Sequence, residues 1–266
     1  MSQDDHESLD LDLDNLATWS NTWQILFNAS KCKILSITNN PARFPYSLGE
    51  EHLEHVKCHR YLGVTCSSQL RWSVHVNIIV NKANKTLGIV RRILKPCGAA
   101  VKSRAYLALV RPQLEYASTA WNPHDNKSVN KLEQVQKNTA RFVTGVYLWS
   151  TSSSGLVSSL GWSRLEQRRL LNMALLFFKF HNSLIASQIP SEFVPSNRRS
   201  RSHSSTYRQV QTNYVLSFTY SFFPRAVRLW NMLPPEAVQS TSIESFKDII
   251  STVTADLKVP IYLKRL

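Results

Sequence analysis

The stretch YLGVTCSSQLRWSVHVNIIVNKANKTLGIVRRIL, residues 61–94, contains the change of hydrophobic period that decides the fold. Its first part has a glycine at position 63 between two short runs typical of strands, which predicts a β-hairpin. From Trp72 onward, apolar residues recur with a period of 3.6 at Val76, Val80, Ala83, Leu87, Val90 and Leu94. We therefore expect a hairpin followed directly by a long amphipathic helix, which ends before Pro96 and Gly98.

Upstream of this stretch, the sequence predicts one helix and a small antiparallel sheet. SLDLDLDNLATWSNTW favours a helix from Ser8 to Ser20, with Ser8 as N-cap and early acidic residues that suit the helix dipole. WQILFN at 23–28 and CKILSIT at 32–38 indicate two strands.

Downstream, the spacing of apolar residues predicts further helices. We expect one over 99–116, bent at Pro112, and one over 127–143 with Val129, Leu132, Val135, Thr139 and Phe142 facing inward. The serine-rich segment 150–155 has the composition of a linker, and 195–209 that of a basic loop.

Three more helices are predicted after the linker from their N-terminal signals. Ser163 and Glu166 have capping-box spacing before a helix that reaches about Ile185. Pro224 indicates the first turn of another helix, with Phe223, Val227 and Trp230 on one face and Arg225 and Arg228 on another. Thr241 and Glu244 repeat the capping-box spacing before a last helix through Phe246 and Ile250.

These elements predict an α+β fold that is predominantly α-helical, in which a small antiparallel β region precedes a helical bundle. The expected domains are 1–70, 71–149 and 150–266.

The distribution of charge predicts a polyanionic partner. The chain has 266 residues and a formal net charge of +14, and residues 71–210 hold 21 Lys and Arg against five Asp and Glu. Charge alone fits both nucleic acid and an anionic membrane surface. The longest apolar run, at 170–178, is too short to span a bilayer.

The acidic N-terminus does not resemble a targeting signal, and the four cysteines do not resemble a disulfide framework, so we expect an intracellular protein, nuclear or cytoplasmic.

Two groups of side chains have the residue types of a metal site. A zinc site would draw on His52, His55, Cys58, His59 and Cys66, but their spacing fits no standard zinc motif. Asp4 and Asp5 resemble paired metal-binding carboxylates, but they lack a preceding apolar strand. We expect no metal site, and no nucleophile motif or phosphate-binding loop is present.

The cations of the predicted helices are the remaining candidates for a site. Such charges are often only the solvated face of a helix, but three helices repeat the arrangement. We expect them to follow a phosphate backbone; they are Lys82, Lys85, Arg92, Lys102, Arg104, Arg111, Lys131, Lys137 and Arg141. Tryptophan side chains could stack on bases, but for most of them we expect a place in the core. They lie at positions 72, 121, 149, 162 and 230.

Several segments together resemble the C-terminal part of the reverse transcriptases of jockey-like non-LTR retrotransposons. They include DLDNLATWSNTWQILFNASKCKIL, the stretch at 61–94, SRAYLALVRPQLEYASTAW, KLEQVQKNTARFVTG, LGWSRLEQRR and RLWNMLPPEAVQSTSIESFK. The resemblance implies a palm remainder up to residue 70, a thumb over 71–149 and a further helical region. It also implies template-primer duplex of RNA and DNA as the partner.

The resemblance also implies roles for individual residues. Asn28 and Lys31 match a palm motif whose lysine approaches the nucleotide phosphates. Tyr61, Leu62 and Gly63 match the turn of the primer grip, where glycine lets backbone pass close to a sugar-phosphate chain.

The catalytic aspartates of that family, which bind Mg²⁺, are expected upstream of the helix at 8–20, before this sequence begins. The resulting expectation is a truncated fragment, inactive alone and without a cofactor, that retains nucleic-acid binding. The alternatives are a free-standing RNA-binding or partner-binding helical module and, third, the zinc module.

Overall fold

The computed structural model describes residues 3–37, 44–193, 207 and 216–256. It forms two compact units, Met1–Val74 and His75–Leu266. The described residues are mostly helical with small two-stranded sheets, which confirms the predicted fold class. The division into three domains stays a prediction.

The first unit begins with a helix that is longer than predicted. α1 spans Gln3–Thr22, so Ser8 lies inside the helix and its prediction as N-cap is wrong. Asp4 and Asp5 lie in the first turn, where carboxylates interact favourably with the helix dipole.

The strands of the first unit form three separate pairs, not one antiparallel sheet. β1 (Lys33–Ile34) pairs in parallel with β4 (Glu54–His55). The antiparallel pairs are β2 (Ser47–Leu48) with β3 (Glu51–His52), and β5 (Cys58–Tyr61) with β6 (Val64–Ser67).

The predicted strand at 23–28 is wrong. The backbone of Ile25 is bonded to Ser20, through Ile25 N to Ser20 O at 3.0 Å and Ser20 Oγ to Ile25 O at 2.6 Å. These bonds turn the chain back on the end of α1, and a 3₁₀ turn, η1 (Ala29–Lys31), follows. Both backbone polar groups of Ile25 are therefore used locally and are not available to a sheet.

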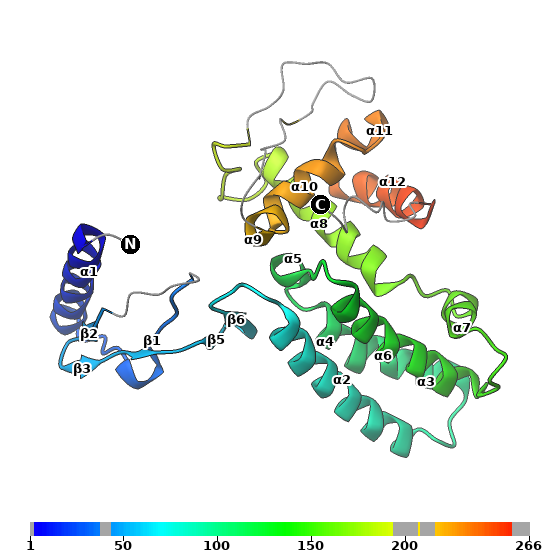
Figure 1. The fold of residues 1–266 in the computed structure, drawn as a ribbon. Coiled ribbons are helices and arrows are strands. Elements are labelled where there is room, and N and C mark those ends of the chain that lie inside the picture. Colours follow the sequence, from blue (N-terminus) through cyan, green and yellow to red (C-terminus); the bar gives the residue numbers. More distant parts are fainter. Residues whose placement is uncertain (1–2, 38–43, 194–206, 208–215, 257–266) are drawn as a thin grey trace. The chain divides into compact units, whose positions relative to one another are not determined.

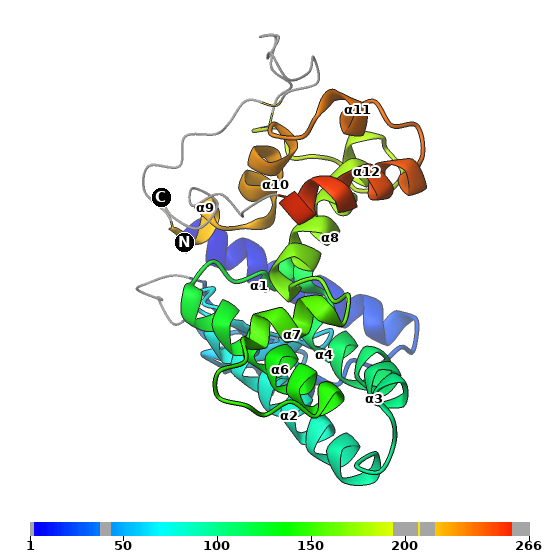
Figure 2. The ribbon, with the colours of Figure 1, turned by 90° about the vertical axis from the view of Figure 1, so that its right-hand side faces the viewer.

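The helices of the second unit form two groups joined by α8. α2 begins at Ser73, just before the boundary between the units, and α2, α3, α4 and α6 lie alongside one another, whereas α10, α11 and α12 gather around the C-terminal half of α8 (Figures 1 and 2). Their bounds are α2 Ser73–Ile93, α3 Ala99–Ala105, α4 Arg111–Glu115, α5 Ser118–Trp121, α6 Asn126–Thr144, α7 Ser153–Ser159, α8 Leu165–His181, α9 Leu216–Thr219, α10 Phe222–Trp230, α11 Pro235–Val238 and α12 Ile243–Asp256.

The long amphipathic helix after the hairpin is confirmed as α2. Val76, Ala83, Leu87 and Val90 of the predicted apolar stripe are buried, while Val80 and Leu94 are half-buried.

The predicted bend at Pro112 takes the form of a π-helical turn, η2 (Tyr106–Val110), between α3 and α4. Pro112 has no N–H to donate, so the regular ladder is interrupted there. The chain adapts one residue earlier, where Arg111 N donates to Tyr106 O, five residues back. One extra residue is thereby accommodated within a continuous helical segment.

α6 confirms the helix predicted over 127–143, with one more residue at each end. The Asp125 carboxylate accepts a hydrogen bond from Ser128 N at 2.7 Å and caps the N-terminus. Gly145, in the left-handed region at φ +71°, ends the helix. All five residues predicted to face inward are buried.

The segment predicted as a linker begins a helix instead. Ser152 Oγ accepts a hydrogen bond from Gly155 N at 3.3 Å and caps α7. Leu156 and Val157 of α7 are buried, and α7 packs on α6. The serines at 152–154 therefore begin a helix. Serine is common in linkers, but it is also a favoured residue at the N-terminus of a helix.

Two other predicted helix starts are displaced by one residue. α8 follows Arg164 rather than Ser163, and it ends at His181 rather than at Ile185. Before α12, Ser242 Oγ, not Thr241, accepts from Ser245 N at 3.1 Å. The predicted basic loop at 195–209 lies outside the described residues except for Tyr207.

The core of the C-terminal helices is aromatic. Phe177 and Phe178 of α8 lie beside Trp230 of α10, with ring centroids 5.2 and 6.5 Å away. Phe246 of α12 stacks on Phe178 at 4.3 Å. These rings join α8, α10 and α12 into one cluster, in which Trp230 of the apolar face predicted for α10 and Phe246 of the predicted last helix are both buried.

Candidate nucleic-acid interface

One face of α6 carries only cationic and amide side chains. Residues spaced by three and four positions share a helix face. On α6 this face, here called the α6 ridge, consists of Lys127, Asn130, Gln134, Lys137 and Arg141, all exposed or half-buried. The sequence contains no Asp or Glu between Glu133 and Glu166. The ridge therefore offers cations and amides to a ligand and no carboxylate.

α2 lies beside α6 and adds further exposed cations. Lys131 Nζ of α6 donates to Asn77 Oδ1 of α2 at 2.6 Å, and Arg91 of α2 donates to Asn138 O of α6 at 2.7 Å. Lys82, Lys85 and Arg92 of α2 are exposed.

The stretch of sequence that contains α2 carries charged side chains of one sign only. Eleven Lys and Arg and no Asp or Glu occur in the sequence between Glu54 and Glu115. Such an excess of positive charge attracts polyanions at long range.

The predicted phosphate-binding residues divide into two sets. Lys82, Lys85, Arg92 and Arg104 are exposed, and Lys137 is half-buried on the α6 ridge.

The second set makes contacts within the protein. Lys102 Nζ lies 5.0 Å from the centroid of the Phe142 ring. The Arg111 guanidinium lies 3.8 Å from the Glu115 carboxylate. Arg141 donates to Leu148 O at 3.3 Å and to Thr151 O at 3.1 Å, and Lys131 is bonded to Asn77 as described above.

In the first unit, the predicted hairpin is confirmed as β5 and β6. Leu62 and Gly63 form its turn with φ angles of +45° and +85°, the positive pair that a tight two-residue turn requires. The Tyr61 side chain is 69% exposed beside this turn. An exposed phenol beside a tight hairpin turn can contact a ligand, but the primer-grip role stays a prediction.

Lys31 is the last residue of the 3₁₀ turn η1, and Asn28 directly precedes this turn. Asn28 Oδ1 accepts from Ser30 Oγ at 2.6 Å, and Lys31 is exposed. A depression of about 430 Å³ is lined by residues 26–30 and by Glu51. Because Glu51 adds a negative charge to this depression, its residues fit a phosphate less well than the α6 ridge does.

The candidate zinc ligands do not converge. Within the part of the chain that the structure describes, no three His, Cys, Asp or Glu side chains are grouped to hold a metal ion. His52 Nδ1 lies 3.3 Å from Ser47 Oγ, and His55 Nε2 lies 2.7 Å from Phe44 O. The hairpin sets His59 opposite Cys66, which is one pair and not a tetrahedral set.

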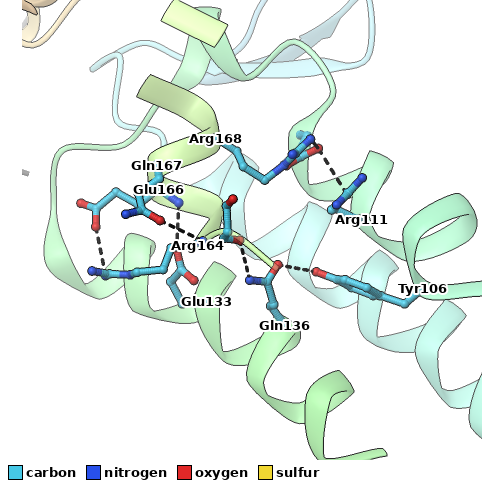
Figure 3. A network of polar contacts seen from close by, with 10 residues as sticks. Tyr106, Arg111, Glu133, Gln136, Arg164, Glu166, Gln167 and Arg168 are labelled. Atoms are coloured by element: carbon cyan, nitrogen blue, oxygen red, sulfur yellow. Dashed lines mark hydrogen bonds and ion pairs between the residues drawn. The ribbon is translucent and has the colours of Figure 1, made fainter. Parts of the chain in front are cut away.

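A buried polar network that sequence reasoning missed joins α8 to the α2–α6 bundle. Figure 3 shows Tyr106 donating to Gln136 Oε1 at 2.7 Å, while Gln136 Nε2 donates to Ser163 O at 3.0 Å. Glu133 Oε1 accepts from Glu166 N at 2.8 Å, so α6 supplies an acceptor at the start of α8. The capping box predicted for Ser163 and Glu166 is therefore wrong, because a side chain from another helix takes its place.

The outer part of the same network consists of ion pairs. Arg168 of α8 binds the Glu115 carboxylate, with its second guanidinium nitrogen at 3.1 Å, and this contact raises the pKa of Arg168 (Figure 3). Glu115 is thus shared by Arg168 and Arg111. These arginines are occupied within the protein and are poor candidates for phosphate binding.

Two further arginines are fully buried. Arg169 Nε donates to Asn122 Oδ1 at 3.1 Å, and Arg225 donates to Asn122 O at 2.6 Å. Burial lowers the pKa of Arg169, which Glu133 and Glu166 oppose, and lowers that of Arg225 to about 10. Both cations hold α8 and α10 to the end of α5, and neither is accessible to a ligand.

Among the described residues, no helix is long and apolar enough to cross a membrane.

Comparison with known proteins gives one informative similarity. The chain is 24% identical over 137 residues to the RNA-directed DNA polymerase from mobile element jockey of Drosophila melanogaster. The aligned region is 50% of this chain and 15% of that relative. No family model matches the chain, and no solved structure does. The chain is therefore distantly and partially related to a non-LTR retrotransposon reverse transcriptase.

Proposed function

We propose that the second unit binds nucleic acid through the α6 ridge and the exposed cations of α2. The observation that carries this proposal is the carboxylate-free face of α6, with Lys127, Lys137 and Arg141 interleaved with Asn130 and Gln134. Lysine and arginine neutralise phosphates, and amide side chains donate hydrogen bonds to phosphate and sugar oxygens.

The relation to a retrotransposon polymerase supports template-primer duplex as the ligand. The name of that relative describes synthesis of DNA on RNA, so its substrates include both nucleic acids. In this proposal the α2–α6 bundle acts as a thumb that holds the duplex, and the hairpin at Tyr61 acts as a primer grip. Because the match covers 15% of the relative, the proposal extends to binding and not to polymerisation.

A salt titration tests the proposal. If the chain neutralises about five phosphates of an RNA–DNA duplex, the logarithm of the association constant should fall as the logarithm of the salt concentration rises, with a slope of about −4 to −5. The measurement is fluorescence anisotropy of a labelled duplex with the full chain. Salt-insensitive binding, or none at about 50 mM salt, would contradict the proposal and favour a module that binds a protein partner.

Charge reversal locates the interface. Lys85→Glu combined with Lys137→Glu should make the salt slope less steep by about 2, because two phosphate contacts are lost. Lys247→Glu combined with Lys179→Glu, on α12 and α8, makes the same change of charge at one exposed and one half-buried lysine. Arg141 is left unchanged because it also holds a loop. Equal losses for the two double variants would show attraction by net charge without a defined site.

A further inference from the structure

The loop between α6 and α7 exposes an aromatic pair. Tyr147 is 64% exposed, and Trp149 is 100% exposed. Trp121, Trp162 and Trp230 of the same unit are all buried. A whole indole in water costs hydrophobic free energy, so its complete exposure on an ordered loop indicates a contact surface.

The backbone of this loop is fixed at several points. Arg141 donates to Leu148 O and Thr151 O, and Thr151 N donates to Leu148 O at 3.2 Å. Val146 N donates to Thr144 Oγ1 at 3.3 Å. A held loop loses little conformational freedom on binding, which favours a recognition surface.

The loop continues the α6 ridge. Arg141 is the last residue of the ridge and also the side chain that holds the loop. The loop itself, residues 145–152, contains no charged residue and has serine and threonine beside its aromatic pair. A polyanion that follows the ridge toward the C-terminus of α6 therefore meets Tyr147 and Trp149 next.

We propose that Trp149, with Tyr147, stacks on an unpaired base of a nucleic-acid strand whose phosphates lie along the α6 ridge. Aromatic rings beside a cationic groove are the usual means of binding single strands, because every base has a π-face. The faces of paired bases are covered by their neighbours, so the ligand is a single-stranded extension of the bound duplex. This inference rests on the nucleic-acid binding proposed above.

Binding of two different ligands tests this inference separately from the proposed function. One is a blunt RNA–DNA duplex, and the other is the same duplex with a short single-stranded extension. Trp149→Ala should weaken binding of the extended duplex about tenfold, which is the usual effect of one stacked base, and leave the blunt duplex within about twofold. Trp149→Phe keeps an aromatic ring and should restore most of the lost affinity.

A matched control is Trp23→Ala, which removes another exposed indole, from the first unit. It should bind both ligands as the unchanged chain does. Equal affinity of the Trp149→Ala and unchanged chains for the extended duplex would overturn the inference alone, since salt-dependent binding of the blunt duplex would still support the proposed function. No binding of either duplex by the unchanged chain would overturn both.

A third probe is a vesicle of anionic lipid. Binding of vesicles that Trp149→Ala abolishes, with no difference between the two duplexes, would identify the aromatic pair as a membrane contact and would also overturn the inference.

Discussion

Replacing Trp230 by alanine should lower the free energy of unfolding by about 4 kcal/mol, the usual cost of removing a large buried aromatic side chain. The indole is 1% exposed and contacts rings from two other helices, Phe177 and Phe178 of α8 and Phe246 of α12. Its loss leaves a cavity at the meeting point of all three elements. Urea denaturation followed by circular dichroism at about 222 nm, where helices absorb, measures the change.

The control is Trp149→Ala, which deletes the same side chain from the surface of the same unit. Its indole is fully exposed, so the expected change in stability is within about 0.5 kcal/mol. Similar losses for Trp230→Ala and Trp149→Ala would contradict the placement of Trp230 in the core. A stable Trp149→Ala protein also means that its altered binding reports a lost contact and not unfolding.

The second large effect is expected at Glu133. Glu133→Ala removes the acceptor of Glu166 N and a carboxylate that stabilises the buried Arg169 guanidinium. Glu166 and Glu115 then remain as the carboxylates that offset the burial of that cation, and the change should cost about 3 kcal/mol. Urea denaturation of the full chain measures this change as well.

Two further variants distinguish the causes of this loss. Glu133→Gln keeps an oxygen acceptor but removes the charge, so its cost should lie between those of Glu133→Ala and the unchanged chain. Gln134→Ala changes the next residue, which is exposed, and should alter stability by no more than about 0.5 kcal/mol. Equal stability of Glu133→Ala and Gln134→Ala would show that the network in Figure 3 does not hold α8 to the α2–α6 bundle.

The amphipathic helices could be predicted from sequence because their signal is periodic. α2 and α6 each bury one apolar stripe against neighbouring helices, and that stripe is visible as a 3.6-residue repeat. The hairpin was also predictable, since Gly63 permits the positive φ that its turn needs.

Short elements and caps could not be predicted because specific contacts, local in one case and tertiary in the other, override the residue composition. WQILFN has strand composition, yet bonds between Ile25 and Ser20 turn the chain back after α1. Ser163 has the spacing of a cap, yet Glu133 from α6 supplies the acceptor at the start of α8. Glu133 lies far from Ser163 in the sequence, whereas Ser20 is only five residues from Ile25, but its bonds outweigh the strand composition of WQILFN.

For the candidate site, the sequence predicts the residue types but not which of them are available. Arg225 and Lys85 look alike in a charge count, but one is buried against Asn122 and the other is exposed. Similarly, residue type alone does not distinguish Trp149 from Trp230; only their neighbours do, since Trp230 lies on a predicted apolar helix face and Trp149 directly before the serine-rich segment. The one available signal for the polar network was the presence of Glu133 and Gln136 beside the apolar stripe of α6.

The π-helical turn at Tyr106–Val110 changes the direction in which the side chains beyond it project from the helical segment that contains it. In an uninterrupted α-helix, Arg104 and Arg111 would share one face, because seven residues make nearly two turns. The inserted residue rotates everything beyond it by about 100° relative to that helix, so Arg111 turns away from the face of Arg104 together with Glu115, its ion-pair partner four residues later. Deleting one residue from this turn would restore the regular ladder but place Arg111 six residues after Arg104, about 120° away around the helix, so the two guanidinium groups would remain on different sides.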